Sequence, residues 1–356
     1  MTRREALDLR LRRQRLIDPA SDRDEYLELF RSLQPVSTLH NTRPGAPPTL
    51  GPRADFDDLA LTDDLRATGD LLKGRFLGGG VGYVLREDFE LYANAFVRPV
   101  ASFTEAQIAV LEAIRSCGPI TPRQIKEETG LLIKEITPAL NRLQSGFLVF
   151  EEQYDSDWER PFGLLEDSLP EVEIDETKHA AAVAEVLSRF VGSYGVATTQ
   201  HIRDWSQLPR KIIDRAVSEL LSGRRIVETE IDEQVPAFVI PQATGSGDND
   251  AEIARTPESV FMLDRADPLT RGETSELKNR FRHHEVLQYL LIDGDFSGAV
   301  LGHWRIGPYD VDDILVHLDP VACLKRRDAI LEIVARRYHP PYSSIVRYCG
   351  QALEAR

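Results

Sequence analysis

The 356 residues include 42% hydrophobic and 28% charged side chains, the composition of an ordinary soluble globular protein. A formal net charge of −15 argues against a protein that coats nucleic acid with its whole surface, because an acidic surface repels phosphates. The sequence has no apolar run of the roughly 18–20 residues that span a bilayer, no signal-peptide core and no CxxC pair. We therefore expect a cytoplasmic, monomeric protein without membrane contact, metal or cofactor.

Residues 1–100 predict an N-terminal winged-helix-like module that contains a proline-rich loop. Leucines at helical spacing indicate a helix over residues 4–17, and acids in the first turn favour a second helix over 21–33. The loop over 32–53 follows, and its prolines exclude a helix there. The remaining expected elements are a short helix at 62–68, a strand pair at 71–85 and a helix at 86–96.

One sequence pattern then occurs twice, about 77 residues apart. Each copy has an amphipathic helix, a short threonine-capped helix, a third helix that ends at a glycine, and two strands. This is the element order of a winged helix-turn-helix module. We therefore predict a second winged helix at 101–175 and a third at 176–241. The matching positions are Thr121 and Thr198, Ile125 and Ile202, and Gly146 and Gly223.

The last hundred residues have a different pattern. Residues 242–257 are polar and contain glycine, which predicts a linker. Beyond the linker, apolar segments predict strands with a hairpin turn at Asp293 and Gly294, and a helix over 321–337 packs behind them. We predict a C-terminal module at 258–356 and an α+β fold class for the whole chain.

A glycine-rich segment and three histidines are candidate catalytic or ligand-binding features, but their sequence context favours structural roles. The glycine-rich residues 74–83 lack the Lys-Ser/Thr of a phosphate loop, so they favour a hairpin. His283, His284 and His303 have no carboxylate or cysteine at metal-ligand spacing, which favours structural or surface histidines.

Cationic side chains on the two copies form the candidate DNA-binding set. Residues 210–225 hold five Lys or Arg against two acids, and such side chains pair with phosphates. The first copy has fewer cations, and glutamates lie between them in the sequence. Both ribbons are acidic, which leaves open that the modules are packing scaffolds or protein-contact domains. The candidate residues are Arg123, Lys126, Lys134, Asn141, Arg142, Arg210, Lys211, Arg215, Arg224 and Arg225.

Two C-terminal stretches carry a resemblance to a known family. Residues 260–281, VFMLDRADPLTRGETSELKNRF, contain an Asp-Pro-Leu turn and a short helix, and residues 289–304, YLLIDGDFSGAVLGHW, form a strand pair. Together with the tandem winged-helix pattern, they resemble the YcaQ/AlkZ-like winged-helix DNA glycosylases over about residues 5–320. The resemblance implies three winged-helix modules followed by a small C-terminal β-barrel, with a concave DNA-binding surface. It also implies hydrolysis of N-glycosidic bonds to alkylated or crosslinked bases.

The resemblance further implies a catalytic Gln-x-Gln or Gln-x-Asp motif after the second helix, which positions or activates a water. Gln34 matches the first position of this motif, but Val36 stands at the second and cannot accept a proton. The leading expectation is therefore a duplex-DNA-binding protein related to DNA-repair glycosylases, with weak or lost base excision and Gln34 as the remnant of a catalytic site. Three alternatives stay open: an active glycosylase with an altered motif, a winged-helix protein-interaction scaffold, and a Gln34 that only ends a helix.

Overall fold

The computed structural model describes residues 1–39, 46–152, 160–241, 258–303, 310–338 and 345–353. Its elements confirm the predicted mixture of helices and strands. The predicted linker at 242–257 and the tip of the first copy's ribbon lie outside the described residues. None of the described helices is long and apolar enough to cross a membrane.

The N-terminal region contains four helices and a short hairpin, and the third and fourth helices pack against the hairpin. Thr2 caps the first helix and Asp22 caps the second, each by accepting a backbone N–H of the first turn. The predicted strand pair is present, with Leu71 opposite Leu85. The elements are α1 (Arg3–Arg13), α2 (Arg23–Leu33), α3 (Asp58–Ala67), α4 (Phe89–Phe96), β1 (Leu71–Arg75), β2 (Val81–Leu85), and the 3₁₀ turns η1 (Gly51–Arg53), η2 (Leu77–Gly79) and η3 (Arg86–Asp88).

The repeated pattern forms two units with the same element order, which we call the first copy and the second copy. The short helices begin at the predicted threonine caps, and the residue before each cap pairs with the ribbon: Ile120 with Phe162, and Ala197 with Phe238. The first copy contains α5 (Glu105–Cys117), α6 (Pro122–Thr129), α7 (Ile133–Ser145), β3 (Val149–Glu151) and β4 (Phe162–Leu164). The second contains α9 (His179–Tyr194), α10 (Thr199–Ser206), α11 (Arg210–Ser222), β5 (Val227–Ile231) and β6 (Val235–Val239), and α8 (Leu165–Ser168) and η4 (Glu176–Lys178) connect the copies.

The two copies bury their apolar side chains differently. The first copy encloses a core of its own, which includes Ile125, Ile136 and Leu143. In the second copy, α9 packs against α4, α2 and α1 as well as α11, so its side chains join one large core with the N-terminal and C-terminal regions. Leu187 of α9 is fully buried in that shared core.

Over its described residues, the C-terminal region is an open sheet and not the barrel that the resemblance implies. Its strands lie in the order β12-β11-β10-β9-β8-β7, and among the described residues the edge strands β7 and β12 do not pair. β11 and β12 have only two residues each, too few to carry the sheet round to β7. The elements are β7 (Val260–Leu263), α12 (Pro268–Gly272), α13 (Thr274–Arg280), β8 (Val286–Ile292), β9 (Asp295–Leu301), β10 (Asp313–Val316), α14 (Pro320–Tyr338), β11 (Arg347–Tyr348) and β12 (Gln351–Ala352).

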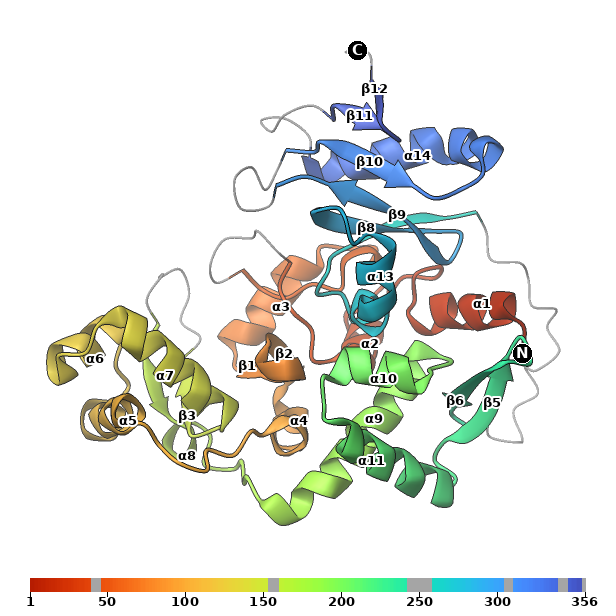
Figure 1. Ribbon diagram of the computed structural model, residues 1–356. Coiled ribbons are helices and arrows are strands. Elements are labelled where there is room, and N and C mark those ends of the chain that lie inside the picture. Colours follow the sequence, from red (N-terminus) through yellow and green to blue (C-terminus); the bar gives the residue numbers. More distant parts are fainter. Residues whose placement is uncertain (40–45, 153–159, 242–257, 304–309, 339–344, 354–356) are drawn as a thin grey trace.

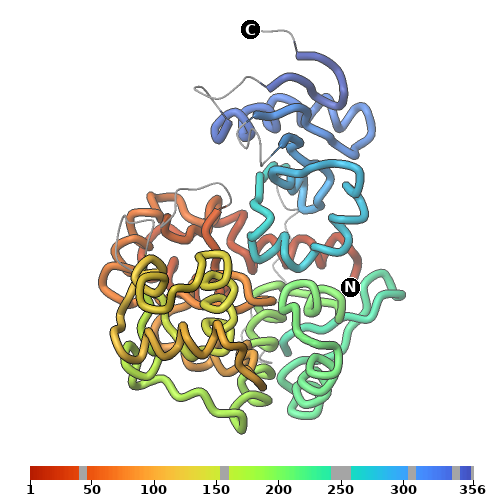
Figure 2. The backbone as a smooth tube through the Cα atoms, turned by 60° about the vertical axis from the view of Figure 1, so that its left-hand side comes forward, coloured from red at the N-terminus to blue at the C-terminus, as the bar shows by residue number. Residues whose placement is uncertain are grey.

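The regions enclose the middle of the molecule. Figure 1 shows the first copy and the second copy on opposite sides of the N-terminal elements, with the C-terminal sheet above them. α12 and α13 lie against α10, so the C-terminal region reaches down to the second copy. The turned view in Figure 2 shows the same stacking of the C-terminal sheet on the other regions.

Candidate functional site

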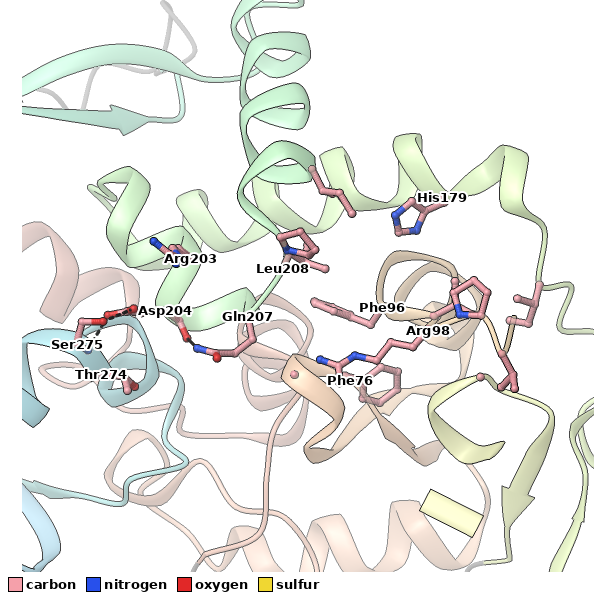
Figure 3. Close-up of a pocket in the computed structure, with 18 of the residues that line it drawn as sticks. Phe76, Phe96, Arg98, His179, Arg203, Asp204, Gln207, Leu208, Thr274 and Ser275 are labelled. Atoms are coloured by element: carbon pink, nitrogen blue, oxygen red, sulfur yellow. Dashed lines mark hydrogen bonds between the residues drawn. The ribbon is translucent and has the colours of Figure 1, made fainter. Parts of the chain in front are cut away.

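A cavity of about 1660 Å³, which we call the central cavity, lies where all four regions meet. Phe76 and Phe96 of the N-terminal region, Leu208 of the second copy and Thr274 of α13 line it, and Figure 3 shows these side chains around its open middle. Gly146 and Leu148 line it from the first copy. Its apolar and aromatic walls with a few polar groups are typical of a binding site.

Three exposed cations, Arg98, Arg203 and Lys278, line the central cavity, one each from the N-terminal region, the second copy and α13. Within the part of the chain that the structure describes, none of the three has a carboxylate at ion-pair distance, and two of the acids that line the cavity, Asp204 and Glu276, have other partners. Glu276, for example, pairs with Arg280 at 2.5 Å. Cations without protein partners are available for an anionic ligand such as a phosphate.

The glycine-rich turn between β1 and β2 borders Arg98, one of these cations. Gly78 and Gly79 have φ angles of +71° and +85°, which side-chain-bearing residues rarely adopt. A Cβ at Gly79 would lie 3.3 Å from Nη1 of Arg98, so any larger residue would press on this guanidinium. The predicted hairpin is confirmed, and its glycines leave room for Arg98 beside the cavity.

Asp204 is the buried carboxylate of the central cavity, and it acts as a helix cap. Its Oδ2 accepts the backbone N–H of Ser275 at 2.7 Å, and its Oδ1 accepts the Ser275 hydroxyl and the Gln200 amide at 2.7 Å each. Figure 3 shows the Asp204–Ser275 contact at the edge of the cavity. These bonds hold the negative charge at the first turn of α13. The Asp204 carboxylate therefore links the second copy to the C-terminal region.

A buried charge cluster makes a second link between these regions. Glu273 Oε1 lies 2.7 Å from Nη1 of Arg10 and accepts the Tyr194 hydroxyl at 2.8 Å. His201 Nε2 lies 3.6 Å from the same oxygen. Burial lowers the pKa of His201 to about 4, and this effect, together with the nearby positive charge of Arg10, outweighs the attraction of Glu273 for the protonated ring. We therefore treat His201 as neutral at pH 7.

The structure places the predicted cations of the second copy on an exposed face. Arg210, Lys211, Arg215 and Arg224 are exposed, and Pro209 and Ile212 at the start of α11 line the central cavity. Two of these cations have ion pairs: Arg225, also exposed, pairs with Glu185 of α9, and Arg210 lies 3.5 Å from Asp214 on its own helix. The start of α11 thus brings several predicted DNA contacts next to the cavity, and their role stays a prediction.

The predicted residues of the first copy divide into two groups. Arg123, Lys126 and Lys134 are exposed, whereas Asn141 and Arg142 are half-buried. Asn141 accepts from Arg75, and the Arg142 guanidinium donates to the backbone carbonyls of Arg98 and Pro99 at 2.7 and 2.8 Å. These bonds tie α7 to the chain that enters the first copy. DNA contacts by this set also stay predictions.

Gln34 is buried, with 1% of its surface exposed, and both ends of its amide have partners. Its Nε2 donates to Oδ2 of Asp88 at 2.6 Å, and its Oε1 accepts the backbone N–H of Leu85 at 2.9 Å. Asp88 in turn accepts from Arg189 of α9 at 2.8 Å. These contacts favour a structural role at the end of α2, and catalysis by Gln34 stays a prediction.

Val36 lines a second cavity of about 370 Å³, which we call the small cavity. Val36 is fixed there because its N–H and carbonyl bond to Tyr83 of β2. The small cavity lies between the chain after α2 and the C-terminal region, whose Asp264 and Gln288 also line it. Both polar side chains are 4% exposed, and Gln288 Nε2 donates to Asp264 Oδ2 at 3.1 Å.

The sequence did not single out Asp264 or Gln288. Asp264 looks like one more acid before the Asp-Pro-Leu turn, and Gln288 is a polar residue inside an apolar strand. The polar residue within β8, whose seven residues are all buried, was the available signal. A buried amide requires a partner, and only the fold shows which one it has.

Comparisons with known proteins agree with this fold. The model of the family described as DNA glycosylase AlkZ-like matches residues 49–300, a range that begins after Gln34 and Val36. The solved structure of Streptomyces sahachiroi DNA glycosylase AlkZ is similar with a TM-score of 0.67, at 15% identity, over 98% of this chain and 99% of that one. At this identity the likeness shows the fold alone. A comparison with curated protein sequences finds no match. Since the matched range exceeds half of the sequence, the chain belongs to the AlkZ-like DNA glycosylase family.

Proposed function

We propose that the protein binds duplex DNA on the face that holds the central cavity and that its base-excision activity is weak. The observation that carries the proposal is the set of three cations, Arg98, Arg203 and Lys278, that line one cavity of a DNA-glycosylase-family protein without carboxylate partners in the described residues. On a chain of net charge −15, a local group of unpaired cations stands out as a site for phosphates.

The two copies are proposed to act as winged-helix modules, with α11 as the helix nearer to DNA. Their shared element order and the matching bridges of Ile120 and Ala197 to the ribbons support this assignment. The exposed Arg210, Lys211 and Arg215 extend the cationic surface from the cavity along α11. The predicted boundaries at 1–100, 101–175, 176–241 and 258–356 are proposed as the corresponding modules.

The proposal of weak excision rests on what surrounds the motif position. The Gln34 amide is already bonded at both ends, and Val36 has no polar atom in its side chain. A general base typically contributes about 10²–10⁴-fold to a hydrolysis. Excision should therefore be confined to bases that leave easily, such as N7-methylguanine, whose positive charge already weakens the glycosidic bond.

DNA binding is tested by replacing Arg98, Arg203 and Lys278 together with glutamine. The wild-type affinity for a duplex should fall with salt at a log–log slope of about −0.9 per phosphate contact, and the variant's slope should be flatter by roughly two to three units. A matched control replaces Arg13, Arg23 and Arg327, exposed cations that do not line the central cavity, with glutamine. Equal losses in both variants, or no duplex binding by the wild type at 50 mM salt, would contradict the proposal.

A protein-contact role for the first copy is the second candidate function. Leu132 and Ile133 at the start of α7 are 49% and 44% exposed, where a DNA-reading helix would present polar side chains. If this face contacts protein, replacing both residues with serine should leave duplex affinity unchanged. A drop in duplex affinity would assign the start of α7 to DNA instead.

A further inference from the structure

We propose that Cys323 and Cys349 are a site of reversible oxidation, at which their two thiols form a disulfide. Both residues pack against the core of the C-terminal region, and they line neither the central cavity nor the small cavity. The inference therefore goes beyond the proposed function and does not depend on it. The three cysteines of the chain are widely spaced in the sequence, and the fold brings two of them together.

The two sulfur atoms are already in contact. Cys323 Sγ lies 3.7 Å from Cys349 Sγ, although the residues are 26 positions apart in the sequence. A disulfide bond is about 2.05 Å long, so the sulfurs have to approach by roughly 1.7 Å, which side-chain rotation and small backbone shifts supply. Both thiols are free and neither residue is fully buried, so a small oxidant can reach them.

Hydrogen bonds hold the two segments that carry the thiols. Cys323 lies in the first turn of α14, where its carbonyl accepts the Tyr348 hydroxyl at 3.2 Å. Cys349 directly follows β11, and its backbone N–H donates to the Ile314 carbonyl of β10 at 2.8 Å. The fold therefore positions both thiols before any bond forms between them.

Cys349 occupies a position for which turn geometry does not select a cysteine. Cys349 and Gly350 join β11 to β12, and their φ angles are +50° and +77°. Two-residue turns in which both φ angles are positive favour asparagine, aspartate or glycine at the first position. The local backbone thus gives no reason for a cysteine here, whereas the contact with Cys323 does.

The environment of Cys349 makes its reaction depend on an added oxidant. Burial raises the pKa of the Cys349 thiol to about 11, so nearly all of it is protonated at pH 7. Since the thiolate is the form that attacks a disulfide, the bond should form slowly at neutral pH and faster in mildly alkaline solution. In the cytoplasm, where we expect the protein, disulfides are usually transient. The reduced pair is therefore the resting state.

The oxidant is a low-molecular-weight disulfide such as oxidised glutathione. One protein thiolate attacks a sulfur of this molecule, whose S–S bond breaks, and one small thiol leaves. The second protein thiolate then attacks the protein sulfur of the mixed disulfide, forms the Cys323–Cys349 bond and releases the second small thiol. The protein loses two electrons and two protons, and the oxidant gains both.

Peptide mapping without reduction tests the inference in the full-length protein. The protein is equilibrated for hours at pH 8 in mixtures of reduced and oxidised glutathione over a range of ratios, and is then quenched with acid. We expect an intramolecular disulfide between the peptides that contain Cys323 and Cys349, and dithiothreitol should reverse it. The matched control Cys117→Ser, which removes the exposed cysteine at the end of α5, should form the same disulfide. Cys323→Ser should leave Cys349 as a thiol or a glutathione adduct. Glutathione adducts or free thiols at both positions of the wild type, without a bond between them at any ratio, would overturn the inference.

A comparison with the unfolded chain tests whether the fold creates the site. In the same glutathione mixtures, the fraction of disulfide gives the effective concentration of one thiol for the other. It should be at least about tenfold higher in the folded protein than in the protein unfolded by urea, because the fold already holds the sulfurs in contact. The disulfide should then make the protein harder to unfold by the same factor. An effective concentration no higher in the folded protein than in urea would mean that the fold opposes the bond, and the inference would be wrong.

Discussion

The first and second copies have the same order of elements, but they are built into the molecule differently. The first copy has its own core, and α5–α7 stand beside the rest of the protein, as Figure 1 shows. The second copy shares its core with the N-terminal and C-terminal regions through α9. The same sequence pattern has thus produced one unit with its own core and one unit that shares its core with the rest of the protein.

The short helices show how this difference arises. The last residue of each capping box is Gln124 in the first copy and His201 in the second. Gln124 is exposed, whereas the His201 side chain is only 15% exposed and lies beside Glu273, which comes from the C-terminal region. A repeat therefore conserves the local hydrogen bonds of an element, while the side chains around it decide what the element contacts.

Replacement of a core leucine should have the largest effect on stability and should distinguish the two copies. Leu187→Ala in α9 and Leu143→Ala in α7 each empty a fully buried position, which costs about 2–5 kcal/mol. We expect Leu187→Ala to lower the stability of the whole protein and Leu143→Ala to open the first copy alone. Hydrogen exchange measured by region checks this. If Leu143→Ala raised exchange equally in all regions, the first copy would not be an independent unit.

The largely enclosed His201 should make the stability of the protein pH-dependent. Its pKa is about 4 when folded and about 6.5 when unfolded, so the unfolded chain binds a proton that the folded one excludes. The stability is complete above about pH 6.5, and as much as about 3 kcal/mol is lost as the pH falls towards 4. His201→Gln introduces the residue that the first copy has at the matching position, Gln124. The free energy of unfolding, measured with urea, should then depend less on pH between pH 6.5 and 5. An unchanged slope in that window would mean that His201 does not cause it.

Charge removal should distinguish the third helices of the two copies. Replacing Arg210, Lys211 and Arg215 with glutamine should weaken duplex binding about 10- to 100-fold, roughly 1.4–2.8 kcal/mol, and flatten the salt slope. The same change at Arg123, Lys126 and Lys134 should have a smaller effect, because these residues lie away from the central cavity. Binding titrations at several salt concentrations decide this, and a larger loss from the first-copy variant would reverse the assignment.

The smallest expected effect concerns Gln34, which belongs to neither copy but reaches α9 through Asp88. Gln34→Ala leaves the Leu85 N–H and one Asp88 oxygen without their partner, which should cost about 1–2 kcal/mol. Thermal unfolding measures this loss. If Gln34 only holds the structure, excision by the folded fraction should stay at the wild-type rate. A complete loss of excision without loss of stability would instead show that Gln34 takes part in catalysis.

Local signals in the sequence predicted much of the fold. Threonine caps at Thr121 and Thr198 and the hairpin turn at Asp293 depend on neighbouring residues, so their elements could be predicted. The barrel was wrong because closure depends on whether β7 meets β12, which no local pattern encodes. The Asp264–Gln288 pair and its position across from Val36 likewise arise from long-range packing.

The most direct test of the account is hydrogen exchange of the full-length protein with and without a saturating undamaged duplex. The account predicts that DNA protects the start of α11 and the turn at Gly78 and Gly79, both at the central cavity. The start of α7, with Leu132 and Ile133, should exchange as before. Protection confined to α6 and α7, with none at α11 or the glycine turn, would contradict the claim that the second copy and the central cavity form the DNA-binding face.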